Sequence, residues 1–163
     1  ARRFNFLYQP VFPEPQERLN EVVLLPGTDG RKMSKSYRNI IEISASAEEV
    51  KNIVANMVTD PQRIRRRDPG NPDVCSVYAF HGVFSKLGME DIREGCTSAG
   101  IGCVECKRKL AEALNEYLEP IRERREAIRK NPGIIDEVLE QGANLATVIA
   151  ESTLEEVRQA MRI

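Results

Sequence analysis

The pattern of apolar and polar positions divides the chain into helices joined by polar connections. Apolar residues recur every three or four positions over residues 46–57, the spacing that places them on one face of a helix. Ser46 and Glu49 stand three apart at its start, as in a capping box. Similar patterns predict helices over residues 1–8, 73–88, 89–100, 104–130 and 132–163. We expect a bend at Pro120, which has no amide hydrogen to donate, and a weak point at Gly142.

Two short segments are predicted to be extended. Residues 21–26 ("EVVLLP") are an apolar run ended by Pro-Gly, which is typical of a buried strand, and residues 39–44 ("NIIEIS") are a second candidate. Residues 61–72 form a basic connection bounded by prolines, and we place a domain boundary there. The pattern therefore predicts a mainly helical chain, with a small part up to residue 60 and a helical domain over residues 61–163.

Composition narrows the class of protein. The chain is 41% hydrophobic and 30% charged and contains no apolar run long enough to span a bilayer, so we expect no membrane contact. Its net charge of −1 leaves nucleic-acid binding to local patches. The sequence starts without Met or a secretory pattern, so we expect a cytoplasmic piece cut from a longer protein. The single histidine, His81, excludes most hydrolytic triads, and we expect it to be packed or solvent-facing rather than a ligand.

The segment "PGTDGRKMSKS", residues 26–36, is the first candidate for chemistry. Two glycines precede Lys32 and Lys35, whose ammonium groups could neutralise the charge that develops on a leaving pyrophosphate. The hydroxyls of Ser34 and Ser36 would add donors. The spacing does not fit a Walker loop. On composition alone the alternative is a solvated polar hairpin.

The four cysteines are the second candidate. Cys75, Cys96, Cys103 and Cys106 follow the spacing C-x20-C-x6-C-x2-C within 32 positions. The absence of a secretory pattern makes disulfides the less favoured use. Four thiolates without imidazole suit zinc or an iron–sulfur cluster, and the alternative is four small buried residues.

Basic residues near these cysteines are the candidates for RNA contact. Arg63, Arg65, Arg66 and Arg67 could meet phosphates or pair with the neighbouring aspartates, Asp60, Asp68 and Asp73. Lys107 and Lys109 follow Cys106 directly and are the better candidates for phosphate contact. The charges of residues 122–130 alternate in sign, which is typical of a solvated helix face.

These motifs together resemble a known family. "KMSKS", Lys32 to Ser36, is similar to the signature loop of class I aminoacyl-tRNA synthetases, and the preceding "PGTDGR" resembles their tryptophan and tyrosine subgroup. Residues 57–81 and 100–125 are similar to bacterial tryptophanyl-tRNA synthetases in particular. The resemblance covers essentially the whole chain.

The resemblance implies a fold and an activity. Residues 1–60 would be the C-terminal remnant of an α/β, Rossmann-like nucleotide-binding domain, and residues 61–163 a helical anticodon-binding domain. Lys32 and Lys35 would be catalytic. The nucleotide would be bound by Val23, Lys32, Met33, Ser34, Lys35 and Ser36. ATP with Mg²⁺ and tryptophan would be the substrates of activation, tRNA(Trp) the acceptor, and the full-length enzyme a homodimer.

The resemblance also implies what the chain lacks and what its cysteines hold. The family's His-containing ATP motif and most of its tryptophan pocket are absent, so the chain alone should not charge tRNA. Some bacterial members carry a [4Fe-4S] cluster on a similar cysteine pattern, which favours that cluster over Zn²⁺ at the four cysteines. The remaining alternatives are part of a tyrosyl-tRNA synthetase, and a non-catalytic, metal-stabilised RNA-binding module.

Overall fold

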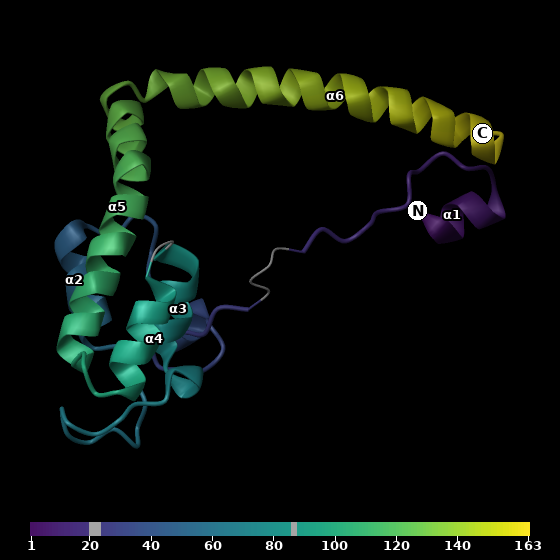
Figure 1. Cartoon of the computed structure of the whole chain (residues 1–163). Coiled ribbons are helices and arrows are strands. Elements are labelled where there is room, and N and C mark those ends of the chain that lie inside the picture. The colour runs from purple at the N-terminus through teal and green to yellow at the C-terminus, as the bar shows by residue number, and fades with distance from the viewer. Residues whose placement is uncertain (20–23, 86–87) are drawn as a thin grey trace. The chain divides into compact units, whose positions relative to one another are not determined.

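The computed structural model describes residues 1–19, 24–85 and 88–163. In this part of the chain the regular elements are helices, and Figure 1 labels the α-helices. In chain order they are α1 (Arg2–Leu7), η1 (Lys35–Tyr37), α2 (Ala47–Ala55), η2 (Pro72–Val74), α3 (Ser76–Phe84), α4 (Met89–Thr97), α5 (Cys103–Lys130) and α6 (Gly133–Met161). The prediction of a mainly helical chain is confirmed.

The two predicted strands do not form in the described residues. Residues 21–23, and with them Val23, lie outside this description, while Leu24 and Leu25 are irregular and Leu24 is 73% exposed. Residues 39–42 are irregular and residues 43–44 form a turn, in which the amide of Ala45 donates to the carbonyl of Glu42 at 3.0 Å. A short apolar run becomes a strand only beside a partner, and the only pairing among described residues is an isolated antiparallel bridge, Pro26 with Lys32.

The chain forms two compact units, residues 1–19 with 126–163 and residues 20–125. In the first unit, the side chain of Asn5 holds the loop after α1. Its nitrogen donates to the carbonyl of Phe12 at 2.6 Å, and its oxygen accepts from the backbone amides of Val11 and Phe12. The longest helix of this unit is α6, which continues through Gly142. One glycine costs a helix only about 1 kcal/mol, so Gly142 does not interrupt this helix of 29 residues, and the weak point there stays a prediction.

The hydrophobic core of the second unit is built around α5 (Figure 1). Four buried residues recur along one face of α5 at helical spacing: Leu110, Ala111, Leu114 and Leu118. They cluster with Val50 and Val54 of α2, Met57, and Val77 and Phe80 of α3. This core contains residues from both sides of the connection 61–72. The division into domains at residue 60 stays a prediction, but α2 packs with the helices that follow it.

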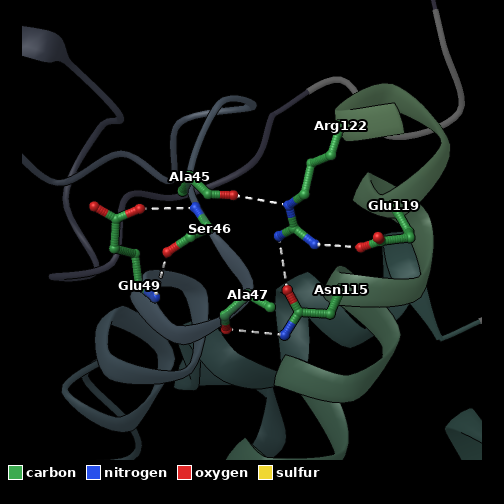
Figure 2. A network of polar contacts seen from close by, with 7 residues as sticks. All are labelled: Ala45, Ser46, Ala47, Glu49, Asn115, Glu119 and Arg122. Carbon is green, nitrogen blue, oxygen red and sulfur yellow. Dashed lines mark hydrogen bonds and ion pairs between the residues drawn. The ribbon is translucent and has the colours of Figure 1, made fainter. Parts of the chain in front are cut away.

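Polar contacts reinforce the junction between α2 and α5, as Figure 2 shows. The capping box predicted at Ser46 and Glu49 is confirmed, with each side chain bonded to the other residue's backbone amide. From α5, the guanidinium of Arg122 donates to the carbonyl of Ala45 at 2.9 Å and to the side-chain oxygen of Asn115 at 2.7 Å. The amide of Asn115 donates to the carbonyl of Ala47 at 3.2 Å. These contacts hold the segment that connects residues 32–36, which we call the lysine loop, to α2.

Candidate functional site

The lysine loop rises from a tight turn over residues 26–32. The amide of Gly27 donates to the carbonyl of Arg31 at 2.7 Å, and the amide of Gly30 donates to the carbonyl of Gly27 at 3.0 Å. Gly30 has a φ of 82°, a conformation that residues with a side chain rarely adopt. Asp29 accepts hydrogen bonds from the backbone and the guanidinium of Arg31. The turn is therefore ordered by its own backbone, which the sequence presented only as a flexible pair of glycines.

The loop combines partly buried residues at its centre with exposed lysines on both sides of them. Met33 is half-buried and packs against the hydrophobic core, while Lys32 and Lys35 are exposed. Ser34 precedes the short η1 helix, which ends at Arg38 with a left-handed φ of 53°. Neither lysine forms an ion pair with a described residue. The loop thus presents two ammonium groups to the solvent from an anchored backbone.

A buried asparagine ties this loop to the turn below it. Asn39 is 2% exposed, and its side-chain amide donates to Asp29 at 2.7 Å and to the carbonyl of Lys32 at 3.1 Å. Hydrogen bonds from Asn39, the largest cause, and from Arg31 lower the pKa of Asp29 to about 2. Asp29 is therefore ionised at neutral pH and joins Asn39 to Arg31 in this network.

The four cysteines come from three neighbouring helices. Cys75 caps α3, Cys96 lies in the last turn of α4, and Cys103 and Cys106 lie in the first turns of α5. All four are partly buried and free of disulfides. Burial, followed by the neighbouring thiols, raises the pKa of Cys96, and the same causes raise that of Cys106 to about 12. The thiols are therefore close enough to influence one another electrostatically.

The thiols are nevertheless not arranged as a ligand set. Within residues 1–19, 24–85 and 88–163, no group of three or more His, Cys, Asp or Glu side chains is placed so that it could hold a metal ion. The donor chemistry fits a thiolate-bound centre, whereas the side-chain positions do not yet converge on one point. The metal-binding role of the four cysteines stays a prediction.

Arginines from the connection 61–72 bind the loop over residues 98–102, which lies between Cys96 and Cys103. The guanidinium of Arg63 donates to the carbonyl of Ile101 at 2.7 Å and lies 3.9 Å from the sulfur of Cys96. That of Arg66 donates to the carbonyls of Ala99 and of Gly100, the latter at 2.7 Å. Arg63 and Arg66 thus bind backbone carbonyls of the loop that follows α4, and no ion pair of the described residues joins them to the nearby aspartates. The contact of these two arginines with phosphates stays a prediction.

The nearby aspartates and lysines also have partners. Asp60 is buried and accepts the backbone amides of Gln62 and Asn71, and Asp73 pairs with Arg93 at 2.9 Å. Lys107 donates to the carbonyl of Ala55, the last residue of α2, at 2.9 Å. Lys109 lies 3.6 Å from Glu105. Contact of Lys107 and Lys109 with phosphates stays a prediction.

His81 is packed, as expected. It is fully buried, with Nδ1 2.6 Å from the hydroxyl of Ser85 and Nε2 3.1 Å from the carbonyl of Cys106. Because a carbonyl only accepts, Nε2 carries the hydrogen and Nδ1 accepts from Ser85. Burial, the largest cause, lowers the pKa of His81. The histidine therefore joins α3 to α5 in its neutral form.

Comparison with known proteins decides the family. The family of "tRNA synthetases class I (W and Y)" matches residues 1–119. This chain belongs to that family. The lysine loop and the turn before it lie within the matched residues.

Individual relatives are tryptophan–tRNA ligases. The chain is 50% identical to the tryptophan–tRNA ligase of Aquifex aeolicus over 165 aligned positions, which cover 100% of this chain and 42% of the relative. For the enzyme of Thermotoga maritima the identity is 48%, with 100% and 50% covered. The chain thus spans about half the length of these relatives and resembles the C-terminal part of bacterial tryptophanyl-tRNA synthetases.

A solved structure shows the same fold. The tryptophanyl-tRNA synthetase of Campylobacter jejuni, solved with ADP and tryptophan, matches with a TM-score of 0.78 and 29% identity, covering 100% of this chain and 51% of that one. The expected helical fold is confirmed by this match. No helix in the described residues is both long and apolar enough to traverse a bilayer.

Sequence reasoning missed two residues that shape these sites. Asn39 was included only in a predicted strand, and Arg122 only in a solvated helix face. An asparagine directly before an apolar pair, Ile40 and Ile41, and four positions after Lys35 was the available signal for the first. No local pattern distinguishes Arg122 from the exposed arginines that follow it.

Proposed function

We propose that this chain is the C-terminal part of a cytoplasmic tryptophan–tRNA ligase, which activates tryptophan with ATP and transfers it to tRNA(Trp). The observation that carries the proposal is the lysine loop, whose Lys32 and Lys35 are exposed on an anchored backbone in a chain of this family. The named relatives at 48–50% identity favour tryptophan over tyrosine. The full-length protein is proposed to act as a homodimer.

The loop would serve the leaving group of the activation step. The carboxylate of tryptophan attacks the α-phosphorus of ATP, a new carboxyl–phosphate bond forms, and the bond to the pyrophosphate oxygen breaks. Lys35, with Lys32, would neutralise the charge that grows on the pyrophosphate. Magnesium would supply further neutralisation of the phosphate oxygens. Since no described group of carboxylates is placed to hold it, we expect it to arrive with the nucleotide. Ser34 and Ser36 would donate hydrogen bonds to the nucleotide beside Met33, and Val23 would contact it through its backbone.

Substitution of Lys35 in the full-length enzyme tests this role. Lys35→Ala should slow tryptophan-dependent pyrophosphate exchange by about 10²- to 10³-fold, the effect of removing one charge-stabilising donor, with an unchanged melting temperature. Lys51→Ala removes another exposed lysine, which lies 3.9 Å from Glu48, and is the matched control. Near-normal exchange in Lys35→Ala would remove the loop from the mechanism. Exchange with tyrosine but not tryptophan would identify a tyrosyl enzyme, and tRNA binding without any exchange would favour a non-catalytic RNA-binding module.

We further propose that Cys75, Cys96, Cys103 and Cys106 hold a [4Fe-4S] cluster, with Zn²⁺ as the alternative. Their all-thiolate chemistry suits either centre, and their partial burial at three adjacent helix ends supports the proposal. Loading requires the side chains to rotate toward a common point. The bound centre would tie α3, α4 and α5 together and so couple metal binding to folding.

Metal content tests the cysteine proposal. Protein purified without oxygen should contain about four irons per chain and show broad visible thiolate-to-iron absorption. Cys103→Ser should lose the metal and melt at a lower temperature. One zinc per chain without colour would indicate the alternative centre. If the unsubstituted protein contains no metal and melts at the same temperature as Cys103→Ser, the cysteines are packing residues and not metal ligands.

A further inference from the structure

The side chain of Asn39 bonds to the main chain of the lysine motif on both sides of Met33. Its amide nitrogen donates to the carbonyl of Lys32 at 3.1 Å, and its carbonyl oxygen accepts the backbone amide of Ser34 at 2.8 Å. Both bonds are made to the main chain, immediately on either side of Met33. A buried asparagine therefore fixes the backbone from which the lysines project.

The turn below the loop is shaped to receive this side chain. The second amide hydrogen of Asn39 goes to Asp29 at 2.7 Å, and its backbone carbonyl accepts the amide of Thr28 at 2.9 Å. A Cβ at Gly27 would lie only 2.2 Å from the amide nitrogen of Asn39, so only glycine admits the asparagine here. The carbonyl of Thr28 in turn accepts the amide of Val58, just beyond α2, at 2.9 Å. The contact network thus runs from the loop through Asn39 and Thr28 to the backbone just after α2.

We propose that Asn39 is a positioning residue for the activation reaction, which latches the main chain of the lysine loop so that Lys32 and Lys35 are held toward the phosphates. The inference rests on the proposed function for its chemical consequence, but the latch itself is a property of this chain. The side chain of Met33 packs against the core and so resists movement of the loop away from it. This apolar contact by itself does not fix the orientation of the peptide groups on either side of Met33. The two bonds from Asn39 define those peptide orientations.

The consequence for catalysis follows from how the loop would act. Lysine side chains stabilise a developing charge best when the backbone that carries them is already ordered. If the backbone had to become ordered during the reaction, the entropy cost would raise the barrier. Loss of the latch should therefore lower kcat while tryptophan binding is unchanged. We expect a decrease of about 10- to 100-fold in rate, which corresponds to about 1.4–2.7 kcal/mol and lies within the range for the loss of two neutral hydrogen bonds.

Two substitutions in the full-length protein perturb the latch by different routes. Asn39→Ala removes the amide, whereas Gly27→Ala keeps the amide and forces it away from Lys32 and Ser34. Gly142→Ala is the matched control, because nothing lies within 4 Å of the Cβ it would add. Pyrophosphate exchange is measured per titrated active site, which separates slow sites from unfolded protein. Tryptic cleavage after Lys32 and Lys35, followed by mass spectrometry, reports the order of the loop independently of activity.

The expected result is a decrease of about 10- to 100-fold in kcat for both latch variants, with KM for tryptophan unchanged and faster cleavage at both lysines. The double variant should be no slower than the worse single variant, since both remove one latch. Unchanged kcat per active site and unchanged cleavage would overturn the inference, as would a Gly27→Ala variant that behaves like Gly142→Ala. If the unsubstituted enzyme forms no tryptophanyl adenylate, the proposed function fails, and the cleavage pattern alone then upholds or overturns the latch.

Discussion

Replacement of Arg122 by Met should destabilise the unit over residues 20–125 far more than its place on a charged helix suggests. The side chain of Arg122 is only 15% exposed, and its guanidinium donates to the carbonyl of Ala45 and to Asn115. Methionine keeps the aliphatic stem but removes both bonds and leaves the carbonyl of Ala45 without this donor. The substitution therefore tests the hydrogen bonds that Arg122 makes in Figure 2.

The magnitude follows from the environment of each contact. A hydrogen bond from a charged donor contributes about 1.5–3 kcal/mol, and partial exposure of Asn115 places its bond at the lower end. The ion pair with Glu119, whose side chain is 59% exposed, adds little. We expect Arg122→Met, which loses both bonds, to lower the free energy of unfolding by about 3–4.5 kcal/mol. Arg108→Met, which removes an exposed pair with Glu112 from the same helix, should lower it by less than about 0.5 kcal/mol.

Urea unfolding followed by far-ultraviolet circular dichroism measures both variants. The loss in Arg122→Met should persist in about 1 M salt, because hydrogen bonds to a shielded carbonyl are screened less than exposed ion pairs. If Arg122→Met is no less stable than Arg108→Met, the junction between α2 and α5 is held by apolar packing alone, and our assignment of the polar network is wrong.

Two further predictions concern the turn and the core. The carboxyl of Asp29 should titrate at about pH 2 rather than 3.8 in a pH series followed by NMR. Since its pKa is lowered in the folded state, its contribution to stability is present above about pH 3.8 and is lost as the pH falls toward 2. In Asn39→Ala the midpoint should rise, and a midpoint that does not move would exclude the amide as the cause. Leu114→Ala, at a position 3% exposed in the core, should lower the free energy of unfolding by about 2–5 kcal/mol, whereas Leu145→Ala, 65% exposed on α6, should change it little. Equal losses in a urea titration would contradict the core that we describe.

The local sequence was sufficient where the physics is local. Helix positions, the capping box of Ser46 and Glu49, and the lysine motif are encoded within windows of a few residues, because helical bonds and caps join neighbours in the chain. The strand predicted over residues 39–44 did not form for the complementary reason. A strand satisfies its backbone groups with a segment elsewhere, so an apolar run such as Ile40 and Ile41 does not specify one by itself.

The sequence by itself determined the family, the order of the helices and the residues that could carry chemistry. Only the tertiary structure decided which arginines serve the fold, since Arg63 and Arg66 bind carbonyls more than 30 positions away. It likewise decided that Asn39 lies inside the turn at Gly27, and that α5 binds both ends of α2 through Lys107 and Arg122. Such contacts depend on the distance between side chains that folding brings together, and no spacing along the chain records that distance.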